Sequence, residues 1–311
     1  MSEDMEQTAT TANPEDFRAG YVAIIGDPNV GKSTLLNTLI GQKISIVSRK
    51  AQTTRHKILG IRSAPGSQII FLDTPGLLQP AYLLQQAMMN FAYAAMDEAD
   101  VVVFMIDATD PKLGPEIEHD TAFGVLRRLQ KPVFLVINKT DLVPKETVAS
   151  IIGFYSVHYA FTEIFPISAL RAEGTEDLAR TLALQLPVHP PFYPPDVVSE
   201  HPERFFVGEF IREKIFETFR EEIPYSTTVD ILEFKEQSGR KDLIRAEIYV
   251  ERESQKGILI GKKGSALREV GEAARRDIET FLGRKIFLEL HVKVRERWRA
   301  SDAWLKRLGY H

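Results

Sequence analysis

The sequence predicts an α/β protein in which a domain with a mostly parallel sheet precedes a smaller α+β domain. Through residue 186, short apolar runs alternate with helix-like stretches, a pattern typical of a parallel sheet covered on both faces. Six prolines between Pro187 and Pro202 interrupt this pattern. Beyond them the order becomes helix, strand, strand, helix, helix, strand. A length of 311 residues agrees with two domains of about 100–200 residues.

The composition excludes several classes of protein. The chain contains no cysteine, which excludes disulfides and thiolate metal sites, and its seven histidines lack the spacing of a zinc site. Residues 1–18 are acidic and polar, unlike a secretory signal, and we expect them to form a disordered tail. No apolar stretch approaches the roughly 20 residues that cross a bilayer, so the sequence predicts a cytoplasmic protein.

The net charge of −4 is unevenly distributed. Residues 256–307 hold 14 basic and 7 acidic side chains. This local excess indicates an anionic partner for the C-terminal part, although a solvated basic helix face would also explain it.

In the first domain, predicted over 19–186, the apolar runs define the elements. We expect strands in "YVAIIG", "SQIIFLD", "DVVVFMIDA", "KPVFLVINK" and "TEIFPIS". The stretch "HKILGIRS" precedes "SQIIFLD" and predicts an antiparallel hairpin at the sheet edge. Helices are expected over Ser33–Leu39, Leu83–Met96, Glu116–Leu129 and Thr175–Leu186.

A proline-rich linker is predicted over 187–203, and the second domain over 204–311. Its expected strands lie in "STTVDILEFKEQ", "KDLIRAEIYVER" and "KIFLELHVKVRE". Long helices are expected over Arg204–Glu222 and Ser265–Leu282, and a short helix ends in "ILIGKKG". A C-terminal amphipathic helical segment carries Trp298 and Trp304.

The segment "GDPNVGKST" follows the first strand, opens a helix and matches the P-loop pattern G-x-x-x-x-G-K-[ST]. Its glycines let backbone N–H groups surround phosphates, and the helix N-terminus adds positive potential. Lys32 is expected to reach the β and γ phosphates, and Ser33 to bind Mg²⁺. The predicted phosphate-binding residues are Gly26, Asp27, Pro28, Asn29, Val30, Gly31, Lys32, Ser33 and Thr34.

"INKTD" lies at a strand end about 110 residues further on, and resembles the guanine-recognition motif of the translation-factor-like GTPases. The resemblance implies that Asp141 accepts hydrogen bonds from two guanine N–H groups, which adenine does not offer. Asn138 would steady the loop and Lys139 would lie over the base. The last motif of these GTPases resembles "SAL", and its residues Ser168, Ala169 and Leu170 would meet the guanine carbonyl through backbone amides.

"FLDTPG" lies between these motifs and predicts a switch segment over Asp73, Thr74, Pro75 and Gly76. Asp73 would hold Mg²⁺ through water, and the Gly76 amide would contact the γ phosphate. Taken alone, D-T-P-G is equally a proline-containing turn, and its position favours the switch.

"AQTTRHK" supplies a second switch threonine. Thr54 is preferred to Thr53 because related families place the metal-binding threonine beside the charged pair that follows, and the choice stays open. The predicted Mg²⁺ ligands are Ser33, Thr54 and Asp73.

Leu77 and Leu78 stand where Ras-like enzymes carry a water-positioning glutamine, so catalysis needs another group. Asn29 resembles the asparagine that binds K⁺ in relatives of the bacterial tRNA-modification GTPases. Alternatively, Asn29 caps the loop in an Asx turn. The predicted catalytic residues are Asn29, Lys32, Thr54 and Gly76.

"ILIGKKGSALREVG" carries a G-x-x-G loop with two lysines between helices. In KH domains such a loop approaches the backbone of about four nucleotides, and the element order here is that of the prokaryotic KH type. An ordinary helix-turn-helix with a solvated basic face is the alternative. The predicted RNA-binding residues are Ile260, Gly261, Lys262, Lys263, Gly264, Arg268 and Arg275.

From about residue 19 onward the chain resembles the Era family, bacterial GTPases of small-ribosomal-subunit assembly, through "GDPNVGKST", "QTTR", "DTPG", "NKTD", "SAL", "EEIPYS" and "IGKKG". The resemblance implies a P-loop GTPase domain followed by a KH domain. It also implies a GTP-hydrolysing switch that uses GTP/GDP, Mg²⁺ and K⁺, and that binds the 3′ end of 16S rRNA in the 30S subunit. A cytoplasmic monomer with peripheral contact to the inner face of the cell membrane is expected. A constitutive RNA-binding scaffold is the competing reading, and a tRNA-modifying GTPase would need a further catalytic domain.

Overall fold

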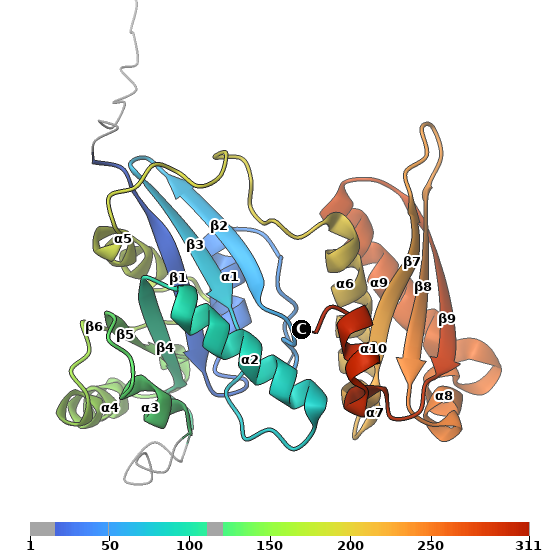
Figure 1. Cartoon of the computed structure of the whole chain (residues 1–311), viewed down its shortest axis with the longest axis horizontal. Coiled ribbons are helices and arrows are strands. Elements are labelled where there is room, and N and C mark those ends of the chain that lie inside the picture. The colour runs from blue at the N-terminus through green and yellow to red at the C-terminus, as the bar shows by residue number, and fades with distance from the viewer. Residues whose placement is uncertain (1–15, 49, 111–120, 311) are drawn as a thin grey trace, which may run out of the picture.

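A computed structural model describes residues 16–48, 50–110 and 121–310 of the chain. Within this part, the apolar runs of the first half form a sheet in the order β2-β3-β1-β4-β5-β6. Strand β1 pairs in parallel with β3 and β4, and β2 pairs antiparallel with β3, which confirms the parallel sheet and its edge hairpin (Figure 1). The strands are β1 (Arg18–Gly26), β2 (Ile58–Ala64), β3 (Ser67–Asp73), β4 (Val101–Asp107), β5 (Val133–Asn138) and β6 (Glu163–Pro166).

Helices cover both faces of this sheet. On one face, Leu35 and Leu182 pack with Phe71 in one buried apolar cluster. On the other face, Met88 and Tyr155 belong to a second buried cluster. The helices are α1 (Lys32–Ile40), α2 (Leu83–Glu98), α3 (Thr121–Leu126), α4 (Lys145–His158) and α5 (Thr175–Gln185). The sheet is therefore buried on both sides, as its apolar strands predict.

Three strands bring the sequence motifs together. Strands β1, β3 and β5 end at Gly26, Asp73 and Asn138. Since these strands run parallel, their carboxyl ends lie at one edge of the sheet, where ligands of open α/β sheets bind.

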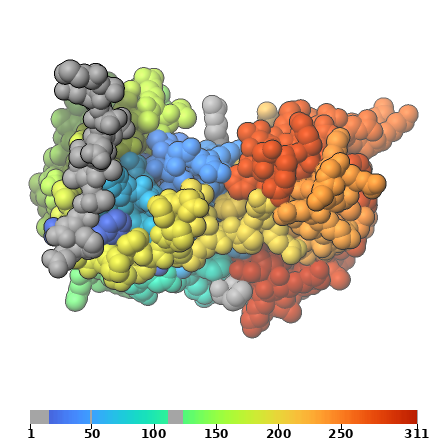
Figure 2. Space-filling view, turned by 90° about the horizontal axis from the view of Figure 1, so that it is seen from above, coloured from blue at the N-terminus to red at the C-terminus, as the bar shows by residue number. Residues whose placement is uncertain are grey.

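The proline-rich linker is bound to the first domain along its length. The Gln68 side chain accepts hydrogen bonds from the backbone N–H groups of Phe192 (2.8 Å) and Tyr193 (3.0 Å). The Ile61 N–H donates to the Val198 carbonyl at 2.8 Å. In Figure 2 the segment, coloured yellow, runs along the surface from the first domain towards the second. These contacts fix the path of the linker on the first domain.

The second domain has the predicted order, with a three-stranded sheet β7-β8-β9. Strands β7 and β8 are antiparallel, whereas β8 and β9 are parallel. Phe206, Ile248 and Ile278 belong to the cluster of buried apolar residues that includes the core of this domain. The elements are α6 (Glu203–Thr218), α7 (Ile223–Ser226), β7 (Thr228–Lys235), β8 (Asp242–Val250), α8 (Glu253–Ile260), α9 (Ser265–Leu282), β9 (Ile286–Val294) and α10 (Asp302–Arg307).

Several predicted bounds are corrected. Arg18 opens β1 although the predicted tail includes it, and residues 1–15 of that tail lie outside the described residues. Helix α6 begins at Glu203, inside the predicted linker, and ends at Thr218 rather than Glu222. The break follows from Phe219, whose φ of −101° and ψ of 157° are extended rather than helical.

Two differences concern helices of the first domain. The prediction over Glu116–Leu129 corresponds to α3, and residues 116–120 lie outside the described part. Helix α4 was not named from the sequence, because its many apolar and aromatic residues and Gly153 blur the helical period. Among the described helices, none combines the length and the apolar character that a membrane span requires.

The C-terminal segment returns to the junction between the domains (Figure 1). The ring of Tyr310, which is buried, stacks on His56 of the first domain with centroids 4.2 Å apart. Trp298 is fully buried, and its indole N–H donates to the Ser226 carbonyl at 2.9 Å. The end of the chain therefore belongs to the packing between the two halves.

Candidate functional site

The phosphate loop adopts a backbone that only some residues accept. Gly26 and Gly31 have φ values of 146° and 105°, and Asn29 has a φ of 68°. At Gly31 a Cβ atom would lie 2.3 Å from Nδ2 of Asn138, so a side chain has no room there. The loop opens α1, and its backbone N–H groups are placed as an anion site requires.

Lys32 lies inside this loop and is buried. Its ammonium group donates to the carbonyl oxygens of Gly26 (3.1 Å) and Asp27 (2.8 Å). Burial lowers the pKa of Lys32 to about 8, against the opposing charges of Asp73 and Asp27. The loop thus holds a desolvated cation that a phosphate would stabilise.

The three predicted Mg²⁺ ligands meet at one point. The Ser33 hydroxyl donates to Oδ2 of Asp73 at 2.7 Å and lies 2.8 Å from the Thr54 hydroxyl. The hydroxyl of Ser45, which the motifs did not predict, also donates to Oδ2 at 2.8 Å. Thr53 instead donates to the Lys50 carbonyl at 2.7 Å, which supports the choice of Thr54.

The buried carboxylate of Asp73 fits a metal site. Its Oδ1 atom is buried and has no hydrogen-bond partner among the described residues. Burial raises the pKa of Asp73, opposed by the hydrogen bond from Ser33 and the charge of Lys32. An uncompensated oxygen beside two hydroxyl groups suits the oxygen-ligated Mg²⁺ ion that accompanies nucleotide phosphates.

The switch segment after β3 contacts the phosphate loop closely. The Thr74 hydroxyl donates to the Ile24 carbonyl at 2.8 Å, and the Leu77 N–H donates to the Gly26 carbonyl at 3.1 Å. At Gly76 a Cβ atom would lie 2.6 Å from the backbone nitrogen of Pro28. Only glycine allows this approach, so one bound ligand can contact both the phosphate loop and the switch segment.

Asn138 links the base-recognition loop to the phosphate loop. Its Nδ2 donates to the Val30 carbonyl at 2.8 Å, and its Oδ1 accepts from the Ala169 N–H at 2.9 Å. Lys139 donates to the Asn29 carbonyl at 3.0 Å and pairs with Asp107, a residue that no motif identified. The predicted guanine-site loops are therefore tied to each other.

Asp141 points into this region with a side chain that is only 7% exposed. The guanidinium of Arg171 lies 3.2 Å from its carboxylate. The neighbouring Ser168 is buried and pairs through its backbone with Glu173, while Leu170 is 84% exposed at the rim. Arg171 follows directly after "SAL", and only this adjacency could have suggested it.

A cleft of about 970 Å³ connects these groups. Gly26, Asp27 and Val30 do not line it, and neither do Asp73, Thr74, Pro75 or Ala169, so these residues support it from behind. One wall comes from the second domain, through residues that the sequence did not predict: Phe216, Glu217 and Arg220. The predicted residues on the lining are Pro28, Asn29, Gly31, Lys32, Ser33, Thr34, Thr54, Gly76, Asn138, Lys139, Asp141, Ser168 and Leu170.

The G-x-x-G loop joins α8 to α9 with Lys262 and Lys263 exposed. Gly261 has a φ of 71°, and a Cβ atom there would lie 2.8 Å from Cβ of Ala266. A groove of about 310 Å³ starts beside the loop and runs between α9 and β9. Its lining joins basic and apolar groups, as a single-stranded RNA site requires: Gly264, Leu267, Arg268, Gly271, Glu272, Arg275, Leu288 and Leu290. Ile260 is half-buried at the end of α8.

Comparisons with known proteins agree with both sites. A family model described as "50S ribosome-binding GTPase" matches residues 21–139, and one described as "KH domain" matches residues 222–299. The GTPase Era of Lacticaseibacillus paracasei is 46% identical over 296 residues, which cover 95% of this chain and 98% of the relative. This chain belongs to the Era family. The chloroplastic GTPase ERA-like protein of Arabidopsis thaliana is 46% identical over 99% of this chain and 72% of its own length.

Two solved Era structures share the fold. An Era variant of Aquifex aeolicus bound to GDP and AlF₄⁻ has a TM-score of 0.87 and 42% identity, and covers 94% of this chain and 99% of its own. Era in complex with MgGDPNP and nucleotides 1506–1542 of 16S ribosomal RNA has a TM-score of 0.88 and 43% identity with the same coverage. The P-loop GTPase domain and the prokaryotic-type KH domain are thus confirmed.

This Era-family GTPase has leucines where a water-positioning glutamine would stand. Leu77 is 3% exposed and packs in the apolar cluster under α2, so its side chain does not enter the cleft. Asn29 is exposed on the cleft wall, and its carbonyl accepts from Lys139. Neither leucine can orient a water molecule, whereas the Asn29 side chain borders the ligand space.

Proposed function

We propose that the chain is a GTP-hydrolysing switch that binds the 3′ end of 16S rRNA and assists maturation of the 30S subunit. The observation that carries this proposal is one chain with a nucleotide cleft and a G-x-x-G groove, similar over nearly its full length to an Era solved with MgGDPNP and 16S rRNA nucleotides. As the family resemblance implies, the protein acts as a cytoplasmic monomer with peripheral contact to the inner face of the cell membrane.

The residues of the cleft have distinct roles in the proposed reaction. Lys32 and the amides of residues 26–34 bind the phosphates, and the Gly76 amide contacts the γ phosphate. Ser33, Thr54 and Asp73 hold Mg²⁺, which supplies charge neutralisation at the phosphates. Asp141 accepts from the guanine ring and selects it against adenine, while Lys139 and the "SAL" amides orient the base.

Asn29 takes the place of the missing glutamine in this proposal. Its position on the cleft wall supports a K⁺ ion bound between Asn29 and the phosphates, which adds positive charge at the transition state. Its positive φ equally suits a turn residue. Equal hydrolysis rates in K⁺ and Na⁺ at matched ionic strength would assign Asn29 to the turn alone.

The RNA strand passes the G-x-x-G loop in this proposal. Lys262 and Lys263 meet its phosphates, and Arg268 and Arg275 border the groove in which the bases lie on Leu288 and Leu290. Gly261 and Gly264 give the backbone clearance, and Ile260 adds apolar surface at the end of α8.

The test reverses charge at this loop. The double variant K262D/K263D should keep its fold and its GTP hydrolysis, because both side chains are exposed in the second domain. Its affinity for an RNA of nucleotides 1506–1542 of 16S rRNA should fall more than 100-fold at physiological salt, roughly the scale of several lost phosphate contacts. Fluorescence anisotropy measures this affinity.

The matched control is R240D/K241D. These two adjacent, exposed basic residues lie in the β7–β8 turn, at the opposite end of β8 from the helix that leads into the loop. The control should lose far less affinity. Equal losses in both variants, or unchanged binding in K262D/K263D, would contradict the RNA assignment.

A further inference from the structure

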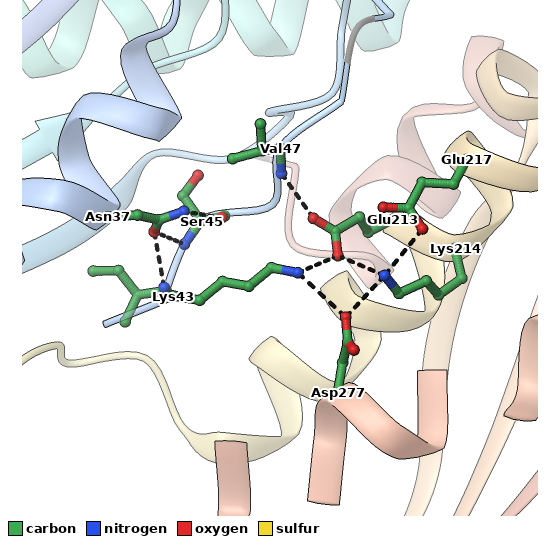
Figure 3. A network of polar contacts seen from close by, with 9 residues as sticks. Asn37, Lys43, Ser45, Val47, Glu213, Lys214, Glu217 and Asp277 are labelled. Atoms are coloured by element: carbon green, nitrogen blue, oxygen red, sulfur yellow. Dashed lines mark hydrogen bonds and ion pairs between the residues drawn. The ribbon is translucent and has the colours of Figure 1, made fainter. Parts of the chain in front are cut away.

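Residues 43–56 connect α1 to β2 and contain Thr54, the residue that meets Ser33 in the nucleotide site. The first part of this segment is fixed to α1. Asn37 accepts hydrogen bonds from the N–H groups of Ile44 and Ser45, both at 2.9 Å, and its Nδ2 donates to the Ser45 carbonyl at 2.7 Å. The same stretch is also held from the other domain (Figure 3).

Glu213 of α6 makes the contacts from the second domain. Its carboxylate accepts from the Val47 N–H at 2.9 Å and from the Lys43 ammonium at 2.5 Å. Lys214 lies 3.5 Å away on the same helix. The Glu213 side chain is only 2% exposed, so loss of one of these partners would leave a buried carboxylate poorly compensated. Figure 3 shows the Glu213 carboxylate pointing from α6 towards Val47 and Lys43.

Asp277 extends the network to α9. Its carboxylate lies 2.8 Å from the Lys214 ammonium and 3.3 Å from that of Lys43. Burial alone would raise the pKa of Asp277, but hydrogen bonds and charge from Lys214 and Lys43 hold it below its usual value. Both lysines are therefore shared between the two acids, and Glu217 adds a further contact to Lys214 at 3.0 Å.

Helix α9 is also the RNA helix of the proposed site. It begins at the G-x-x-G loop and presents Arg268 and Arg275 to the groove. Lys43 is the one charged residue of the first domain in this network, as far as the described residues show. A shift of α9 against α6, or of residues 43–48 against α1, changes the lengths of the same ion pairs.

We propose that Lys43, Glu213, Lys214 and Asp277 form the link through which the nucleotide site and the RNA groove affect each other, with Glu213 positioning the segment that carries Thr54. The inference rests on the proposed function and names the residues that join its two sites. The bonds from Glu213 to Val47 and Lys43 fix the position of this segment. The ion pairs of Asp277 with Lys43 and Lys214 connect it to α9. Coupling of this kind is reciprocal, so either ligand changes the affinity for the other.

The test compares RNA affinity in two nucleotide states. For each protein, anisotropy gives the dissociation constant for RNA of nucleotides 1506–1542 with a non-hydrolysable GTP analogue and with GDP. D277N removes the charge at α9, and K43Q removes the charge at the end of the network in the first domain, where the Lys43 side chain is 41% exposed. Couplings typically span about 5- to 150-fold, and each variant should bring the ratio of the two constants to within about twofold of one.

The matched control is E279Q on the same helix. Glu279 pairs with Lys285 at 2.7 Å and accepts from the Ile286 N–H, both within the second domain. In the described part of the chain it forms no hydrogen bond or ion pair with residues 43–48, so E279Q should keep the wild-type ratio. The double variant D277N/K43Q should show the same ratio as either single variant, because both substitutions remove the same interaction network. Circular dichroism and wild-type-like GDP affinity establish the fold of each.

An unchanged ratio in both D277N and K43Q would overturn the link. If these variants still hydrolyse GTP and bind RNA as the wild type does, the proposed function would be unaffected. If the ratio of the two RNA dissociation constants falls equally in E279Q, the effect comes from a general loss of α9 stability. That result would also overturn the proposed link.

Discussion

At the scale of single residues, the phosphate loop is built around a buried lysine. Lys32 is buried, and its ammonium group is bound to two carbonyl oxygens of its own loop. Its pKa of about 8 means that the free cleft loses this charge as the pH rises through that value. Phosphate oxygens favour the charged form and raise the pKa again, so ligand binding and protonation of Lys32 are linked.

The pH dependence of GDP affinity follows from this linkage. Below pH 8 Lys32 is already protonated, and affinity should be flat. Above it, binding must take up one proton, so affinity should fall towards about tenfold per pH unit. Titration calorimetry between pH 7 and 9, in buffers of different ionisation enthalpy, measures both the affinity and the proton uptake. K32M should bind weakly without proton uptake, and a flat wild-type profile up to pH 9 would contradict the linkage.

The proposed selection of guanine by Asp141 also depends on a single side chain. A carboxylate accepts from both guanine N–H groups, whereas the amide in D141N offers one donor and one acceptor. We expect D141N to bind GTP at least about 100-fold more weakly, since an unpaired polar contact in a site costs about 1–3 kcal/mol for each group. Xanthosine triphosphate, which carries a carbonyl in place of the 2-amino group, should recover most of that loss. Competition binding measures both, and retained GTP preference would remove Asp141 from the base site.

At the scale of elements, the pattern of the sequence is most informative where a motif and a period coincide. Helix α9 has the predicted bounds Ser265–Leu282, because a glycine loop starts it and Gly283 ends it. Helix α6 was predicted four residues too long, because no periodicity reports the extended backbone at Phe219. That the loops after β1, β3 and β5 meet was predictable, because the carboxyl ends of parallel strands lie at one edge of the sheet. Ser45, Asp107 and Arg171 were not, since each contributes through a fold that brings distant loops together.

Arg55 shows how an element of one domain is held by the other. Its guanidinium donates to the carbonyl oxygens of Thr227 (2.7 Å), Pro224 (2.9 Å) and Tyr225 (3.2 Å), around the short helix α7. The side chain is buried beside Phe216. Because Arg55 follows Thr54 directly, this contact also fixes the switch threonine.

Removal of this side chain should therefore affect both domains. R55A leaves the buried carbonyl groups of Thr227 and Pro224 and the half-buried one of Tyr225 without this donor. Each buried group that loses its partner costs about 1–3 kcal/mol, so stability should fall by about 3 kcal/mol. The midpoint of urea unfolding should fall, and GTP hydrolysis should fall with it because Thr54 is released. R240A, an exposed arginine in a turn, should change neither. A wild-type midpoint in R55A would contradict the role of Arg55 as an anchor.

At the scale of the whole molecule, the two domains share a boundary that neither motif predicts. Residues 43–56 of the first domain bind α6, α7 and α9, and Phe216, Glu217 and Arg220 complete the nucleotide cleft. The C-terminal Tyr310 stacks on His56 in the same region. Both sites and a switch that connects them could be predicted from the sequence, but the contacts between the domains could not, because such contacts leave no local period in the sequence. Thr54 meets Ser33 of the phosphate loop on one side, and its neighbour Arg55 binds the second domain on the other.

In the proposed switch, the nucleotide state governs RNA binding. The most direct measurement is the dissociation constant of the wild-type chain for 16S rRNA nucleotides 1506–1542, with a non-hydrolysable GTP analogue and with GDP at the same salt concentration. We expect binding to be at least about fivefold tighter with the GTP analogue, the lower end of typical coupling. Equal constants in the two states would contradict it and would make the protein a constitutive RNA-binding scaffold.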